Sequence, residues 1–108
     1  MTVYVVQEPY KYVDGVPTAK IDLRAAMEFG EVVILAPPGN TLLNTEPILR
    51  TMRDKLREFS DDDLILPLGD PALIMAVGSI AARANNGRVR VLRWDKKRQA
   101  YHIITLNI

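Results

Sequence analysis

The sequence contains no cysteine and a single histidine, His102. Disulfide bonds, thiolate metal sites and cysteine nucleophiles are therefore excluded, and metal and redox chemistry lose most of the side chains that they commonly use. A chain without cysteine also fits a reducing compartment. The sequence accordingly gives no reason to expect a metal ion or another cofactor.

The sequence also lacks a large net charge and a long apolar run. Its 14 Lys and Arg residues nearly balance 13 Asp and Glu residues, which leaves a formal net charge of +1. A nucleic acid or an anionic membrane would have to bind a local patch of cations, because the net charge of the whole chain is too small to attract it. No run approaches the ~20 apolar residues of a membrane helix, and residues 1–4 begin a strand pattern rather than a basic and apolar leader. We expect a cytoplasmic protein without a membrane partner.

The composition is that of an ordinary soluble protein. The chain has 108 residues, of which 48% are hydrophobic and 25% are charged. No repeat, low-complexity segment or change of composition divides it. We therefore expect residues 1–108 to form one α/β domain that buries roughly two thirds of the surface of its unfolded chain.

Residues 64–87 form the stretch around which the rest of the chain is arranged. A short apolar run at 64–68 predicts a buried strand, since it is too brief for a helix. Asp70 can cap a following helix, and Pro71 fits the first helical position, where a missing N–H costs nothing. Gly87 stands where a left-handed residue ends a helix, which predicts a helix over 71–85.

The remaining segments alternate between strand and helix patterns. Strands are predicted at 3–7, 31–36, 88–94 and 101–106, and a tyrosine-rich ribbon or loop at 10–17 around Asp14-Gly15. Asp22 and Gly30 predict the ends of a two-turn helix with Leu23, Ala26 and Met27 on one face. A second helix is capped by Thr45 or Asn44, and its apolar side is formed by Ile48, Leu49, Met52, Leu56 and Phe59.

This order predicts the architecture. Strands that alternate with helices form right-handed crossovers in a mostly parallel sheet. The link at 95–99 is too short for a crossover, so the last two strands form an antiparallel hairpin at or next to a sheet edge. We expect a small three-layer α/β sandwich with about five strands.

Two turns could form a ligand crevice at the carboxyl ends of the strands. If the strands at 31–36 and 64–68 are neighbours, the turns at 36–44 and 68–71 flank one crevice that a nucleotide or another anion could enter. The alternative is that both turns are simple connections, because neither contains a phosphate-loop or dinucleotide fingerprint. The polar candidates for the crevice are Asn40, Thr41, Asn44 and Asp70.

The C-terminal hairpin is rich in cations and aromatic residues. Such a ribbon can neutralise phosphates and stack bases, which makes nucleic-acid binding a candidate function. The alternative is edge protection by charge, with Trp94 and Tyr101 packed as a cross-strand pair. The candidate nucleic-acid-binding residues are Arg88, Arg90, Arg93, Trp94, Lys96, Lys97, Arg98 and Tyr101.

No catalytic set is recognisable. His102 has no partner at a recognisable spacing, and Ser79 lies within the predicted helix rather than in a hydrolase elbow. The acidic cluster at 60–63 precedes a strand and fits a solvated turn better than a metal site. We therefore predict neither catalytic nor metal-binding residues.

The helix at 71–85 is apolar nearly all round. A helix of this kind is buried on both sides, and only one side can face the sheet. The other side, lined by the small or apolar residues Ala72, Met75, Ser79 and Ala82, could pack on another part of the chain or on a second subunit. We expect a homodimer.

Three segments carry a resemblance to known proteins: DDDLILPLGDP at 61–71, AARANNGRV at 81–89 and LRWD at 92–95. They resemble small uncharacterised proteins encoded in tailed-bacteriophage genomes, over roughly the C-terminal half of the chain, with an echo in VYVVQEP at 3–9. The resemblance implies an intracellular role in an infected bacterium and no catalytic residue.

The leading functional hypothesis is a non-enzymatic binding or protein-interaction module, a homodimer with an unidentified protein partner. The alternatives are nucleic-acid binding through the hairpin and nucleotide or anion binding at the two turns.

Overall fold

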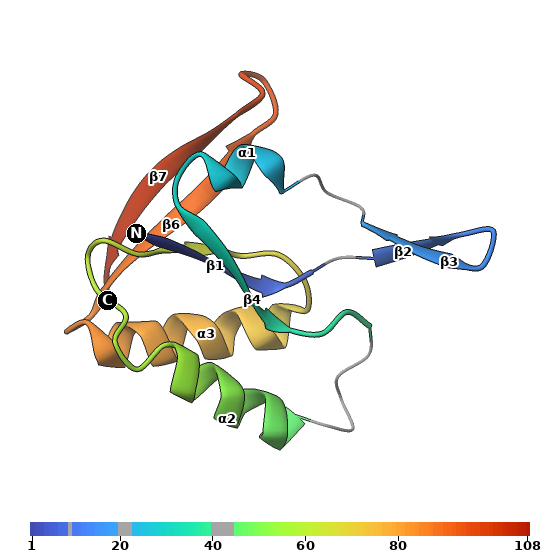
Figure 1. Ribbon diagram of the computed structural model, residues 1–108. Helices are drawn as coiled ribbons and strands as arrows, with labels where there is room; N and C mark the ends of the chain where they lie inside the picture. The colour runs from blue at the N-terminus through green and yellow to red at the C-terminus, as the bar shows by residue number, and fades with distance from the viewer. Residues whose placement is uncertain (9, 20–22, 40–44) are drawn as a thin grey trace.

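Five strands form one sheet in the order β4-β1-β5-β6-β7 (Figure 1). The computed structural model describes residues 1–8, 10–19, 23–39 and 45–108. Every strand of the sheet matches a predicted one, with small differences at the ends. These strands are β1 (Thr2–Gln7), β4 (Glu31–Ala36), β5 (Leu64–Leu66), β6 (Arg88–Asp95) and β7 (Ala100–Asn107).

The short strand β5 lies at the centre of the sheet. It pairs in parallel with β1 on one side and with β6 on the other, and all of its side chains are buried. β4 extends the sheet beyond β1 in the parallel sense, whereas β7 runs antiparallel to β6. The predicted mixed sheet, mostly parallel with an antiparallel C-terminal hairpin, is therefore confirmed.

The helices lie on both faces of this sheet (Figure 1). The two long helices α2 and α3 cover one face, and the short helix α1 covers part of the other, so the predicted three-layer sandwich is confirmed. α3 packs on β1, β6 and α2. The helices are α1 (Arg24–Met27), α2 (Thr45–Lys55) and α3 (Pro71–Ala84).

Both ends of α3 follow the sequence signals. The Asp70 carboxylate accepts a hydrogen bond from the N–H of Ala72 at 2.8 Å, and Pro71 opens the helix. At the other end the N–H of Gly87 donates to the carbonyl of Ala82 at 2.7 Å, and Gly87 adopts a φ of +85°. A φ of this sign favours glycine, which explains the residue at this position.

The helix α1 is shorter than predicted. It has 4 residues instead of two turns, and Met27 is 58% exposed, whereas Ala26, predicted on the same face, is buried. The chain must turn into β4 directly after α1, at Gly30 (φ +149°), where an added Cβ would lie 2.4 Å from the carbonyl oxygen of Met1. The predicted cap Asp22 lies outside the described residues.

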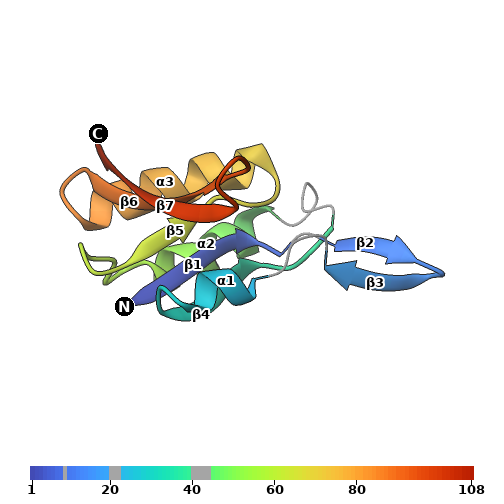
Figure 2. The same cartoon turned by 90° about the horizontal axis from the view of Figure 1, so that it is seen from above.

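A separate two-stranded ribbon extends away from the main sheet in both views (Figures 1 and 2). β2 (Tyr10–Val13) pairs antiparallel with β3 (Val16–Ala19). Between them Asp14 and Gly15 have φ values of 52° and 78°. Positive φ at both central residues is the geometry of a two-residue hairpin turn, so the predicted ribbon is confirmed.

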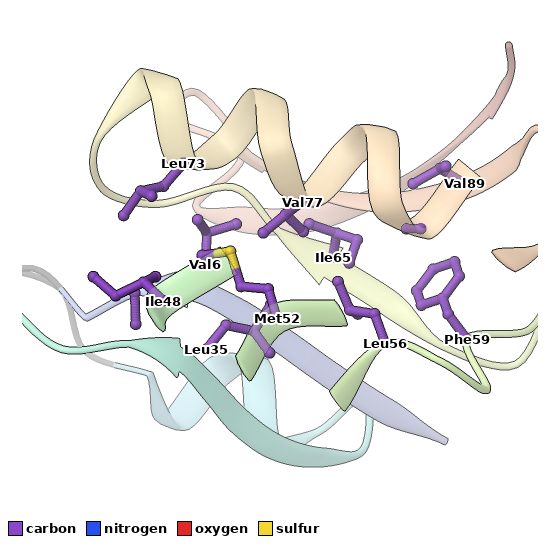
Figure 3. Close-up of a cluster of buried hydrophobic side chains, with 12 residues drawn as sticks. Val6, Leu35, Ile48, Met52, Leu56, Phe59, Ile65, Leu73, Val77 and Val89 are labelled. Carbon is purple, nitrogen blue, oxygen red and sulfur yellow. The ribbon is translucent and has the colours of Figure 1, made fainter. Parts of the chain in front are cut away.

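The larger core cluster lies between the sheet and the helices α2 and α3 (Figure 3). Met52 and Leu56 are fully buried there, and each such side chain contributes about 1.5–3 kcal/mol through removal from water. On the other face Ala26 of α1 packs in a second cluster with residues of β1, β5 and β6. In the described part of the chain, no helix combines the length and the apolar character needed to cross a bilayer.

The Tyr4 ring packs at the edge of the larger cluster, with its centroid 6.1 Å from that of Phe59. Burial raises the pKa of the Tyr4 hydroxyl above its ordinary value of 10.0, and the carboxylate of Asp63 raises this pKa further. Because the folded state resists ionisation of this hydroxyl, the resulting stability is complete below pH 10.0 and is lost as the pH rises through the raised pKa.

We therefore expect Tyr4→Phe to reduce the alkaline loss of stability. Urea unfolding should give a smaller decrease in the free energy of unfolding for Tyr4→Phe than for the natural protein between about pH 9 and pH 11. The comparison uses this decrease because Tyr4→Phe also removes a hydrogen bond with the Thr2 side chain, which lowers the free energy of unfolding at neutral pH. Equal decreases in the two proteins would show that Tyr4 ionises as easily in the folded chain as in the unfolded one.

Candidate functional site

The two predicted crevice turns are joined by a side chain that the sequence analysis did not single out, that of Gln7. Gln7 is 5% exposed and ends β1. Its Nε2 donates to the carbonyls of Pro37 and Gly39, at 2.9 Å each, and its Oε1 accepts from the N–H of Asp70 at 2.9 Å. One amide therefore ties the turn after β4 to the turn before α3.

The sheet order explains this bridge. β4 and β5 are not neighbours, because β1 lies between them, so the condition that the sequence analysis set for a shared crevice is not met. Gly69 (φ +110°) allows the close approach of Gln7, since an added Cβ at Gly69 would lie 2.5 Å from the Cβ of Gln7.

The polar candidates for this crevice have different outcomes. Asp70 uses its carboxylate as the cap of α3 and its N–H for Gln7. Asn40, Thr41 and Asn44 lie outside the described residues. Nucleotide or anion binding at these turns stays a prediction.

The predicted nucleic-acid-binding residues fall into two separate groups. Arg88 and Arg90 lie at the start of β6, where both contact Asp61. Arg88 forms an ion pair with the Asp61 carboxylate, and Arg90 donates to the Asp61 carbonyl at 2.6 Å. Asn85 donates to the same carboxylate at 2.8 Å. Asp61 therefore holds these two cations at the base of the hairpin.

The rest of the acidic cluster also makes local structural contacts. Asp63 accepts hydrogen bonds from the N–H of Thr2 and from that of Ser60, both at 3.1 Å. Across the residues that the structure describes, no three His, Cys, Asp or Glu side chains are grouped so that they could hold a metal ion.

The second group lies at the far end of the hairpin, called here the hairpin tip (residues 93–98). The paired residues of β5 and β6 are Ile65 and Val91, so the tip lies beyond this contact and projects from the sheet (Figure 1). The Asp95 carboxylate accepts from the N–H groups of Lys97 and Arg98, at 2.9 and 3.2 Å. Asp95 thereby fixes the turn that presents Lys96, Lys97 and Arg98, all of them exposed.

A hollow of about 640 Å³ opens at the hairpin tip. Its lining combines cationic, aromatic and apolar residues with one carboxylate. No hydroxyl or thiol side chain is part of this lining, so it supplies no nucleophile of the serine or cysteine type. The lining residues are Arg93, Trp94, Asp95, Lys96, Lys97, Arg98, His102 and Ile104.

His102 has a carboxylate partner that the sequence analysis did not find. Its Nε2 lies 3.4 Å from an Asp95 carboxylate oxygen. The register explains the pair, because Arg93 faces His102 and Asp95 faces Ala100, which puts Asp95 and His102 on the same face of the hairpin. This pair could have been predicted from the sequence, because the length of the turn determines which residues of the two strands face each other.

Trp94 combines packing with exposure. Its ring lies across the strands from Tyr101, with centroids 4.9 Å apart in an edge-to-face arrangement, so the predicted cross-strand pair is confirmed. Tyr101 in turn packs edge-to-face on Phe29. Trp94 nevertheless remains 41% exposed.

The role of Gln7 can be tested by removing its hydrogen bonds while keeping its size. We expect Gln7→Met to lower the free energy of unfolding by about 1–3 kcal/mol or more, because two carbonyls and one N–H lose their partner. Urea unfolding measures this loss. Gln99→Met is the matched control, because the hydrogen bond that its Nε2 donates to the Lys96 carbonyl (2.8 Å) lies at an exposed position where water can replace it. A loss under about 0.5 kcal/mol for Gln7→Met would show that water satisfies the freed groups.

Comparison with known proteins gives a family. No curated protein and no solved structure matches the chain. A family model described as "Phage Pam3 gp32-like protein" matches residues 1–108. The resemblance to phage-encoded proteins is therefore confirmed, and it extends over the whole chain rather than over the C-terminal half alone. The chain belongs to the Phage Pam3 gp32-like protein family.

Proposed function

We propose that this protein is a non-catalytic binding module of the infected cell's cytoplasm, and that its hairpin tip binds single-stranded nucleic acid. One observation carries the proposal. Cations and an exposed tryptophan line the same hollow at the projecting end of the hairpin. This combination fits a strand whose phosphates are neutralised and whose bases are stacked.

The charges at the tip are available for a ligand. Within the described part of the chain, no carboxylate forms an ion pair with Arg93, Lys96 or Lys97, and Arg98 lies 4.0 Å from Asp95. Arg88 and Arg90 differ, because Asp61 already contacts them. The proposal therefore assigns phosphate binding to the tip and excludes the base of the hairpin.

A single strand fits this surface better than a duplex. Base stacking needs an aromatic face that unpaired bases can reach, and Trp94 is partly exposed beside the cations. A duplex hides its base faces, so it would use only the cations. We expect single strands to bind more tightly than duplexes of the same sequence.

Neutralising the turn should weaken binding in a salt-dependent way. We expect the triple change Lys96→Gln, Lys97→Gln and Arg98→Gln to lower the affinity for a single-stranded oligonucleotide. It should also reduce the salt slope by about 2, since each lost phosphate contact removes about 0.7. Fluorescence anisotropy across a salt series measures both effects.

Two controls make this test specific. Changing Arg50 and Arg53 on the exposed face of α2, and Arg57 in the turn after it, to Gln removes an equal charge and should leave the slope nearly unchanged. Changing Arg88 and Arg90 to Gln should also leave the slope nearly unchanged. If all three variants weaken binding equally, or if the natural protein does not bind at low salt, the tip is not a nucleic-acid site.

Trp94 gives a direct signal, because it is the only tryptophan of the chain. Binding of an oligonucleotide should quench its fluorescence. Trp94→Ala should weaken binding by about 1–3 kcal/mol, which is the contribution of one stacked base, whereas Trp94→Phe should retain most of the affinity. Thermal melts of both variants control for the lost contact with Tyr101. Tight binding without quenching would rule out stacking on Trp94.

A second candidate function is self-association, which the sequence analysis expected on the outer face of α3. On that face Met75 is 77% exposed. A different observation favours self-association more strongly, namely the open edge of the sheet at β7. We propose that the module is a homodimer.

A further inference from the structure

β7 forms the last strand of the sheet, and no strand in the described ranges pairs with its outer side. The strand has 8 residues and pairs with β6 in one continuous register, from Arg88 opposite Asn107 to Asp95 opposite Ala100. A long regular edge of this kind is a template for another strand.

The hydrogen bonds of β7 determine which backbone groups are open. The N–H of Ile108 donates to the carbonyl of Gly87 at 2.6 Å, so these two residues face each other as a hydrogen-bonded pair. In an antiparallel ladder such pairs alternate with pairs that are not hydrogen-bonded. Leu106 and Ile104 therefore direct their N–H and C=O groups toward β6. The alternate residues of the strand, Ile103 and Thr105, direct their N–H and C=O groups toward the open edge.

β7 lacks the features that usually protect an edge. Its sequence, AYHIITLN, contains no Lys, Arg, Asp, Glu or Pro, and its register contains no bulge. Ile103 and Leu106 are 42% and 43% exposed. At the opposite edge of the sheet, by contrast, Lys55 donates to the carbonyl of Ile34 in β4 at 3.2 Å.

We propose that β7 pairs antiparallel with β7 of a second copy of this chain, around a two-fold axis at Ile104. The inference rests on the self-association proposed above and assigns its surface. In this register Ile103 of each copy exchanges hydrogen bonds with Thr105 of the other, since both residues direct their backbone groups outward. Ile104 faces Ile104 of the second copy.

The side chains of β7 suit this register. The ionisable side chains of β7 are those of Tyr101 and His102. His102 would face Leu106 of the second copy, so no like charges meet. Ile104 and Leu106 lie on the same face of the hairpin as Val89 and Val91, which belong to or pack against the larger core. Pairing would extend this apolar face across the axis and cover Leu106.

A single-cysteine cross-link tests the register directly, because the natural chain contains no cysteine. At a pair without hydrogen bonds the two Cα atoms lie about 4.5 Å apart, within the range of a disulfide. We expect Ile104→Cys to form a covalent dimer under mild oxidation. Thr105→Cys is the matched control and should stay monomeric on denaturing gels. In the proposed dimer the two positions 105 are offset by two residues along the strands, about 7 Å, in addition to the spacing between the strands. This separation is too long for a disulfide.

Light scattering of the intact chain provides an independent test. The natural protein should have twice the chain mass of 12.1 kDa at micromolar concentration. Thr105→Pro removes only an outward-directed N–H, and Ile103→Lys adds a charge at the edge. Each change should raise the dimer dissociation constant at least ten-fold. Met75→Lys on α3 is the control and should leave that constant unchanged.

The outcomes separate the surface from the function. A dimer that Met75→Lys disrupts, with no cross-link at Ile104, would overturn the β7 interface while keeping self-association on α3. A natural protein that is monomeric at every concentration would overturn both. Neither result depends on oligonucleotide binding, which Lys96, Lys97 and Arg98 test separately.

Discussion

The arrangement of the sheet depends on one buried amide. Among the described residues Gln7 is the one polar side chain that is buried, and it ends a strand whose neighbours are apolar. Its hydrogen bonds tie the turn after β4 to the start of α3 across β1. A buried amide is costly unless its donors and acceptors are all satisfied, so the two turns and the strand between them are coupled in position. This coupling occupies the place where α/β sheets commonly bind ligands.

The fold could be predicted because local signals and core patterns agree. Asp70 and Pro71 begin α3, Gly87 ends it, and the apolar run at Leu64 forms the central strand. The extent of α1 could not be predicted, because the position of Gly30 against Met1 is a long-range contact that no local pattern contains. The order of the strands in the sheet could not be predicted either, because several orders are compatible with the same succession of strands and helices along the chain.

The candidate site was predictable in its residues but not in its grouping. Sequence reasoning treats the cations from Arg88 to Arg98 as one cluster, whereas Asp61 holds those at the base of the hairpin and Asp95 shapes the turn at the other end. Asp61 is distant in sequence from Arg88, so their contact depends on the pairing of β5 with β6. Gln7 was missed because a single glutamine after an apolar run resembles an ordinary strand end.

The central place of β5 has a consequence for folding. β1 is made first, yet Val3 pairs with Leu64, and β6 pairs with β5 from the other side. During synthesis β1 must therefore remain without this partner until residues 64–66 have emerged. The β6–β7 hairpin, in contrast, joins neighbouring segments and can form locally. Closure of the sheet is thus dominated by distant contacts, which slow folding relative to a chain of similar size with local contacts.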